Sequence, residues 1–147
     1  MPIVREGLPE DMPGLAALRA TWAAEQDPAA AEDPDFEAAF RDWADANPRK
    51  VFVAEQDGEL VGMLNLMIFQ RMPKPRKEAS CWVYLGNVYV LPQHRNAGIG
   101  RRLVEASVAF AQSIGAARMV LSPSADSRSF YSRLGFQPAE ELDIRKF

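Results

Sequence analysis

The chain is poor in the residues that build metal centres and covalent cross-links: it contains one cysteine, Cys81, and one histidine, His94. A single cysteine excludes an internal disulfide and a cysteine-based metal site. A single histidine disfavours a multi-histidine metal site, and no nucleophile-elbow sequence accompanies it to indicate a Ser-His-Asp triad. The sequence therefore predicts a protein without a bound metal, in which Cys81 is a small buried apolar residue.

Long hydrophobic runs and a strong charge of one sign are also absent. No apolar stretch reaches membrane-spanning length, and the opening residues, MPIVREGLPED, lack the basic-then-apolar order of a signal peptide. The net charge is −3, and the only basic cluster is the short stretch from Arg71 to Lys77, whereas duplex-binding proteins normally show a clustered basic face. We expect a cytoplasmic protein whose partners are neither nucleic acid nor membrane.

The residues that are present suit a single domain over 1–147, with 48% apolar and 25% charged residues. Strands are expected at Ile3–Arg5, Lys50–Gln56, Leu60–Gln70, Ser80–Val90 and Arg118–Ser122, with a last strand or two from Phe136 onward. Helices are expected after Pro9, from Phe36 to Asn47, over about Gly98–Ile114 and near Asp126–Leu134. Gly86 indicates a bulge in its strand or a close approach of another backbone. This order predicts a mixed α/β sheet with helices on both faces.

The most informative segment, residues 88–103, reads VYVLPQHRNAGIGRRL. A β-branched and aromatic strand leads through a proline to a basic residue, two glycines and an amphipathic helix. The amides of a first helical turn point outward, and the helix dipole adds partial positive charge, which suits a phosphate group. Gly98 and Gly100 let the backbone approach a ligand closely because they have no Cβ atom. The segment therefore predicts a site for a phosphorylated cofactor.

The glycine pair is compatible with more than one kind of turn. A dinucleotide fingerprint needs a third glycine, but position 103 is Leu103, and the motif lies late in the chain. A P-loop would continue with Gly-Lys-Ser/Thr, which does not follow here. A plain strand-to-helix turn, with glycine serving tight packing, explains the pair equally well when it is taken alone.

The surrounding sequence favours the phosphate site. From Val90 the chain reads VLPQHRNAGIGRRL, which resembles the R/Q-x-x-G-x-G/A signature of the GNAT family of N-acetyltransferases. The block SADSRSFYSRLGF, at 124–136, is similar to the tyrosine-bearing helix of that family, and VREGLPEDMP resembles its first strand and helix. The resemblance spans essentially the whole chain. It implies an α/β (α+β) fold with a mixed, mostly antiparallel central sheet flanked by helices on both faces.

The resemblance also implies a set of residues that contact acetyl-CoA, the cosubstrate. The backbone of Val88, Tyr89 and Val90 would bind the pantetheine arm. The pyrophosphate would lie on the amides of Asn96, Ala97, Gly98, Ile99, Gly100 and Arg101, with added charge from Arg95 and Arg101. Ser124 stands where many members have asparagine, and it and Ser127 would complete the cofactor contacts. No metal is implied.

Tyr131 corresponds to the family's tyrosine, whose hydroxyl can protonate the departing thiolate. A phenol with a pKa of about 10 is protonated at neutral pH, as an acid must be. Many members carry Glu or Asp on the motif strand as a base, but this chain has Asn87 there. How the amine loses its proton is therefore left open. Glu55, Glu78 or a chain of waters could accept it, or the amine could arrive already neutral.

For the acceptor, the sequence gives conflicting signals. Trp82 and Tyr84 alternate on the strand that leads to Asn87, and these three residues are candidates for lining an acceptor site, although aromatic residues on strands are usually core. The predicted loop after the first helix carries acidic residues that would attract a cationic amine, or would simply be solvated: Glu25, Asp27, Glu32, Asp33 and Asp35. The basic stretch 71–77 indicates an anionic group or a lid instead.

The function expected from these features is transfer of an acetyl group from acetyl-CoA to a primary amine of a small molecule, by direct attack in a ternary complex. A non-catalytic acyl-CoA-binding or sensing module is the alternative that the missing strand carboxylate favours. A protein N-terminal or lysine acetyltransferase, with a peptide amine as acceptor, is the third. A homodimer is an expectation that only the resemblance carries, since relatives are often dimers.

Overall fold

The computed structural model of the protein describes residues 1–147. Five strands form one sheet in the order β1-β2-β3-β4-β5. Their bounds are Ile3–Glu6 for β1, Lys50–Gln56 for β2, Glu59–Gln70 for β3, Cys81–Val90 for β4 and Met119–Val120 for β5. Neighbouring strands from β1 to β4 are antiparallel, and only β5 joins its neighbour in parallel. The expected mixed, mostly antiparallel sheet is confirmed.

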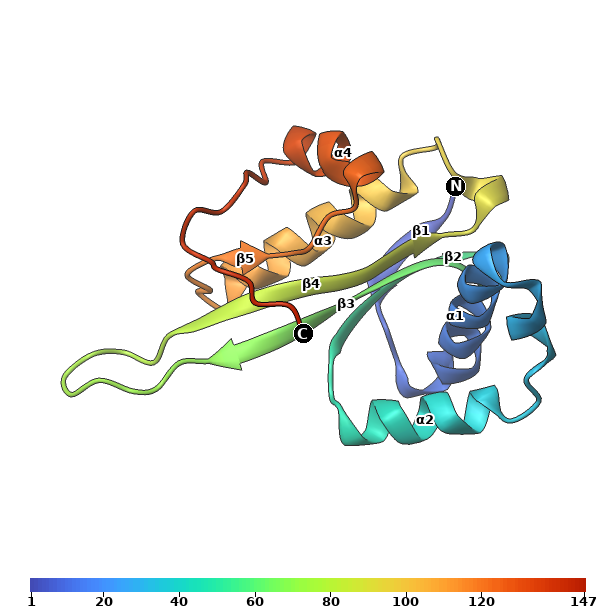
Figure 1. Ribbon diagram of the computed structural model, residues 1–147, viewed down its shortest axis with the longest axis horizontal. Coiled ribbons are helices and arrows are strands. Elements are labelled where there is room, and N and C mark those ends of the chain that lie inside the picture. The colour runs from blue at the N-terminus through green and yellow to red at the C-terminus, as the bar shows by residue number, and fades with distance from the viewer.

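Helices cover both faces of this sheet, as the sequence predicted (Figure 1). The α-helices are α1 at Met12–Gln26, α2 at Phe36–Ala46, α3 at Ile99–Ser113 and α4 at Arg128–Arg133, and short 3-10 helices lie between several elements. Helices α1 and α2 lie on one face, and α3 and α4 on the other. None of these helices combines the length and the apolarity needed to cross a bilayer.

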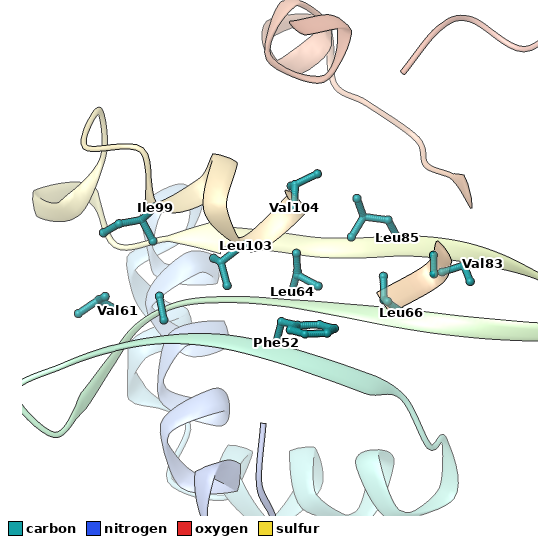
Figure 2. Packing of buried hydrophobic residues seen from close by; sticks show 11 residues of the cluster. Phe52, Val61, Leu64, Leu66, Val83, Leu85, Ile99, Leu103 and Val104 are labelled. Atoms are coloured by element: carbon teal, nitrogen blue, oxygen red, sulfur yellow. The ribbon is translucent and has the colours of Figure 1, made fainter. Parts of the chain in front are cut away.

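The larger hydrophobic core lies between the sheet and α3 (Figure 2). Ile99 and Leu103 are four residues apart and therefore share one face of the helix, where both are buried. From the sheet, Phe52 and Leu64 pack against the same cluster. Burying a leucine of this kind contributes about 2 kcal/mol to folding. This core fixes the first turn of α3 against β3 and β4, and it thereby positions the loop that precedes the helix.

A smaller core lies on the opposite face, between the sheet and α1. It consists of two leucines from α1 and three side chains from the sheet: Leu15, Leu18, Val53, Met63 and Tyr89. Successive side chains of a strand point to opposite faces, so Phe52 belongs to the α3 core while Val53 belongs to the α1 core. Cys81 is 6% exposed and belongs to the buried apolar residues, as expected.

Strand β4 carries a bulge close to its carboxyl end. Asn87 has a left-handed backbone, with φ of 56°. The pairing with β3 passes from Asn65 opposite Gly86 to Met63 opposite Tyr89, so β4 has one residue more than β3 between these pairs. The bulge that Gly86 indicated is therefore present. It reverses the alternation of side chains for the last three residues of the strand.

The two strands β4 and β5 separate after a short contact. They pair only where Val83 lies opposite Met119 and Tyr84 lies opposite Val120. The expected strand Arg118–Ser122 is thus reduced to two residues. From residue 85 to residue 90, the edge of β4 on this side has no strand partner. Backbone groups on such an edge are available to a ligand.

The expectation of one or two strands after Phe136 is wrong. The chain continues past α4 without joining the sheet. Apolar side chains of this segment stay exposed, with Ile144 at 82% and Leu142 at 52%. Alternation of apolar and charged residues in LDIRKF is typical of a strand, but a strand also needs a partner edge, and this segment has none.

A charged cluster ties β1 to the start of α1. The carboxylate of Asp11 accepts hydrogen bonds from Arg5 Nη1 at 2.7 Å, from Arg5 Nη2 at 3.0 Å and from the amide of Leu8 at 2.7 Å. Arg5 Nε also donates to Glu55 on β2 at 3.0 Å. The bonds from Arg5 lower the pKa of Asp11, which is 8% exposed. The cluster therefore requires an ionised carboxylate.

Replacing Asp11 with asparagine is expected to lower the free energy of unfolding by about 2 kcal/mol at pH 7, the scale of a hydrogen bond to a charged group. Because the pKa of Asp11 is lowered on folding, its contribution is complete above the unfolded value of about 3.9 and is lost as the pH falls through the folded value. Urea titrations at pH 7 and pH 3 measure this. Asp42→Asn, on the exposed face of α2, is the matched control, and equal stability of both variants at pH 7 would contradict the assignment.

Candidate active site

The loop between β4 and α3 presents a row of main-chain donors. Its backbone is left-handed at Asn96, with φ of 62°, and at Gly98, with φ of 82°. The amide of Arg95 bonds the carbonyl of Pro92 at 3.3 Å, and the next amide along the chain to donate to a backbone carbonyl is that of Arg102, which bonds Gly98 at 3.0 Å. The six amides of residues 96 to 101 donate no hydrogen bond within the protein. A loop of this shape at a helix N-terminus is suited to an anion.

Five of these six residues, all but Ala97, border a cleft of about 660 Å³, which we call the α3 cleft. Its wall consists of the end of β4, the loop, the first turn of α3, and α4 with the residue after it: Val90, His94, Arg95, Asn96, Gly98, Ile99, Gly100, Arg101, Phe130, Arg133 and Leu134. A Cβ atom on Gly98 would have no atom within 4 Å, and one on Gly100 would lie 3.5 Å from the ring of Phe130, an ordinary contact. Tight packing therefore does not require either glycine, whereas the open cleft beside them suits a close ligand.

Tyr131 is held by the aromatic residues of α4 and the segment after it. Its ring meets Phe130 at 5.0 Å and Phe136 at 5.8 Å between centroids, both edge-on. Burial raises the pKa of Tyr131 above its usual value of 10.0, so the phenol is protonated at neutral pH. Its hydroxyl makes no hydrogen bond within the protein, and no fully buried side-chain oxygen lacks a partner. The hydroxyl is therefore a free donor with access to solvent or ligand.

The two serines before α4 bond each other. The hydroxyl of Ser124 lies 3.0 Å from that of Ser127, which also donates to the carbonyl of Ser124 at 3.1 Å. These bonds close the 3-10 turn Ala125–Ser127 that leads into α4. In this arrangement both side chains shape the turn that positions Tyr131.

A network that the sequence did not reveal joins α1 to this loop. Glu25 accepts hydrogen bonds from the hydroxyl of Tyr89 at 2.7 Å and from Arg95 Nη2 at 2.9 Å. Arg95 Nε donates to the carbonyl of Val90 at 2.9 Å, and its guanidinium lies over the ring of Tyr89, 5.4 Å from the centroid. Burial and the hydrogen bond to Glu25 raise the pKa of Tyr89 to about 12.

This network changes what Arg95 offers to a ligand. Its guanidinium lines the α3 cleft, but its charge is paired with Glu25, and it fastens the loop to β4. Arg101, the second expected cationic contact, pairs with Glu105 at 2.8 Å one turn further along α3. The cleft therefore offers an anion the unpartnered amides and the guanidinium of Arg133, which lines it and forms no ion pair in the protein. No sequence pattern links Glu25 to Arg95, because the two residues are 70 positions apart.

A second cavity, of about 430 Å³, lies on the opposite face, between the sheet and helices α1 and α2. We call it the α2 cavity. Most of its wall is apolar, and it contains no Asp or Glu: Met12, Leu15, Arg19, Phe36, Ala39, Phe40, Trp43, Ala44, Asn47, Pro48, Arg49, Val51, Met63, Leu64, Asn65 and Asn87. Asn65 Nδ2 donates to Asn87 Oδ1 at 2.9 Å. Asn87 is three residues from Val90 on β4, so one strand borders both cavities.

Only one of the three acceptor-site residues expected from the sequence lies at this cavity. Asn87 lines the α2 cavity, but Trp82 and Tyr84 do not. Trp82 packs against Phe69 at 4.9 Å between ring centroids, and the hydroxyl of Tyr84 bonds Ser122 Oγ at 3.2 Å. Both lie further from the bulge along β4, and the bulge is the feature that brings Asn87 to the cavity. The acidic loop residues also lie outside the cavity wall.

The candidate bases from the sequence lie outside both cavities. Glu55 is paired with Arg5 at 3.0 Å, and Glu78 is exposed in the connection between β3 and β4. The molecule is thus an α/β protein with a cleft bordered by unpartnered amides on one side of a split sheet. A second, apolar site lies on the other side.

This fold is shared with a known family of proteins. The chain matches the model of the acetyltransferase (GNAT) family over residues 16–136, and it belongs to this family. It is similar to a glucosamine 6-phosphate N-acetyltransferase of Trypanosoma brucei brucei, with 33% identity over 96 residues that cover 65% of this chain and 63% of that protein. The match thus spans less than two thirds of that relative.

Solved structures agree with this assignment. A GCN5-related N-acetyltransferase of Ralstonia eutropha is 25% identical, with a TM-score of 0.73 and 99% of each chain covered. A predicted acetyltransferase of Clostridium acetobutylicum, determined with acetyl-CoA, is 19% identical and shares the fold, with a TM-score of 0.72 over 99% of this chain and 96% of that one.

Proposed function

We propose that this protein is an N-acetyltransferase that transfers an acetyl group from acetyl-CoA to a primary amine of a small molecule. One observation carries the proposal: the six consecutive amides at 96 to 101 have no acceptor in the protein, and five of these six residues, all but Ala97, line the α3 cleft. A pyrophosphate, the anionic group of coenzyme A, is the kind of ligand that such a row of amides binds. Family membership and the name of the trypanosomal relative support amine acetylation.

In the proposed complex, bound acetyl-CoA supplies an acetyl thioester as the electrophile. The free edge of β4 at Val88, Tyr89 and Val90 binds the pantetheine arm, and a main-chain N–H there polarises the thioester carbonyl. The loop amides bind the pyrophosphate, and Arg95 holds this loop to β4. Ser124 and Ser127 fix the approach of α4 to the cofactor. These roles need no bound metal.

The acceptor enters from the α2 cavity. Its amine nitrogen forms the new bond to the acetyl carbon while the carbon–sulfur bond breaks, and Tyr131 gives its proton to the departing sulfur. The proton that the amine loses passes to water, because no carboxylate lines the α2 cavity, and the Tyr131 phenolate takes a proton back from solvent. Asn87 and Asn65, joined by a hydrogen bond, orient the nitrogen at the bulge.

Calorimetric titration with acetyl-CoA, followed by a thiol-release assay against a panel of amines, tests this function. We expect binding in the micromolar range and amine-dependent release of coenzyme A. The panel includes an amino sugar phosphate, the acceptor in the name of the trypanosomal relative, and peptides with free N-terminal or lysine amines. Release with peptides alone would favour a protein acetyltransferase.

The absence of a carboxylate from the α2 cavity also favours a second candidate, a non-catalytic acyl-CoA-binding module. The same two measurements separate the candidates. Tight binding of acetyl-CoA without amine-dependent release from any acceptor would establish the module and exclude the enzyme. Absence of binding would exclude both.

A further inference from the structure

The chemistry of the α2 cavity narrows the class of acceptor, and the following inference rests on the proposed function. The volume of about 430 Å³ falls within the range of small-molecule sites. Phe36, Phe40 and Trp43 follow one another on one face of α2, with ring centroids 6.0 and 5.9 Å apart. Together with Leu15 and Met63 they give the cavity an apolar wall that suits an apolar body.

The only charged residues of this cavity are two arginines from separate elements. The guanidinium of Arg19 on α1 lies 4.6 Å from the ring centroid of Trp22, and that of Arg49, between α2 and β2, lies 5.5 Å from Trp43. Neither arginine forms an ion pair in the protein, in contrast to Arg95 of the α3 cleft. Two unpaired cations in an apolar cavity are a site for an anionic group.

Hydrogen bonds to the backbone fix the position of the Arg49 guanidinium. Its Nη1 donates to the carbonyls of Asn47 and Pro48, at 3.3 and 3.2 Å, while no partner within the protein occupies its Nε and Nη2 atoms. A guanidinium fixed at one nitrogen and stacked on a ring loses little entropy when the other two bind a carboxylate. Arg49 is half-buried, so the contact is partly shielded from solvent.

We infer that the acceptor is an amine that carries both a large apolar group and an anionic group, as in an α-amino acid with an aromatic side chain. The apolar group would lie against α2, the anion would meet Arg49, and the nitrogen would reach the Asn65–Asn87 pair. A polyhydroxylated amine such as an amino sugar phosphate would satisfy the arginines, but the apolar wall would leave its hydroxyls without partners, which is costly.

A comparison of four acceptors by thiol release, with acetyl-CoA saturating, tests this inference. They are phenylalanine, phenethylamine (which lacks the anion), glycine (which lacks the apolar body) and glucosamine 6-phosphate (which has hydroxyls in place of the apolar body). We expect kcat/KM for phenylalanine to exceed each of the others by about tenfold or more, the scale of one charge-assisted hydrogen bond or one buried ring.

The variant Arg49→Gln separates the anion contact from the rest. It is expected to lower kcat/KM for phenylalanine about tenfold and to leave that for phenethylamine unchanged. Arg41→Gln, on the exposed part of α2 and outside the cavity wall, is the matched control. If Arg49→Gln does not fold, the comparison of the four acceptors with the unaltered protein still tests the inferred acceptor class.

Failure of the inferred acceptor class can be told apart from failure of the proposed acetyltransferase function. Fastest release with glucosamine 6-phosphate, phenethylamine or glycine overturns the inferred acceptor class and leaves the acetyltransferase function standing. An equal loss for phenylalanine and phenethylamine in Arg49→Gln overturns the anion contact. No release with any amine overturns the proposed function and this inference together.

Discussion

Replacing Tyr131 with phenylalanine is expected to lower kcat by about 10²- to 10³-fold, the range attributed to a positioned general acid. The affinity for acetyl-CoA is expected to change by less than about twofold, because the cofactor would still bind to the loop amides and the edge of β4. The hydroxyl makes no hydrogen bond within the protein, so its removal leaves no group unpaired. Stability is therefore expected to stay the same.

Steady-state thiol release, calorimetric titration with acetyl-CoA and thermal unfolding of the same variant provide the measurement and its controls. Because burial raises the pKa of Tyr131 above 10.0, the acid of the unaltered protein stays protonated through neutral and mildly alkaline pH. Below pH 10, kcat is therefore expected not to fall through deprotonation of Tyr131. An unchanged kcat in Tyr131→Phe would remove the assignment of the acid.

The second large effect is expected from Gly98→Val. A valine here would place two methyl groups beside the loop amides and would disfavour the left-handed backbone that aims them, which costs about 1–2 kcal/mol. The dissociation constant for acetyl-CoA is expected to rise by at least about tenfold, equivalent to the loss of 1.4 kcal/mol of binding.

Gly58→Val is the matched control, because it imposes the same backbone strain at a distance from the cleft. Gly58 lies in the β2–β3 turn with φ of 81°, against 82° for Gly98, and neither position has an atom within 4 Å of an added Cβ. Both variants are expected to lose similar stability, and only Gly98→Val is expected to lose affinity in calorimetry. Equal affinities in the two variants would show that the loop is not the phosphate site.

The sequence predicted those parts of the site that depend on neighbouring residues. The order of strand, proline, glycines and helix is local, and the backbone at Gly98 is left-handed as a close approach to a ligand requires. The bulge in β4 was likewise indicated by Gly86, and it was found at the adjacent Asn87. Local backbone geometry follows from residues that are close together, so a short motif can encode it.

Contacts between distant segments were not predictable in this way. Arg95 was expected to face a phosphate, but Glu25 on α1 pairs with its guanidinium. The α2 cavity depends on how two helices pack on the sheet, which no motif records. The segment after Phe136 alternates like a strand and still remains unpaired, because a strand exists only where a neighbouring edge accepts it.

Helix α1 contributes to the α2 cavity and contacts the loop of the α3 cleft. Its middle supplies Leu15 and Arg19 to the α2 cavity, and its last turn supplies Glu25 to the network behind the loop amides. If a ligand in the α2 cavity or the α3 cleft displaced α1, the displacement would therefore also alter the other of these two regions. Such linkage is reciprocal by thermodynamic necessity. If acetyl-CoA changes the affinity for the acceptor by some factor, the acceptor changes the affinity for acetyl-CoA by the same factor. In the proposed ternary complex, α1 is thus the element through which binding on one side could influence binding on the other.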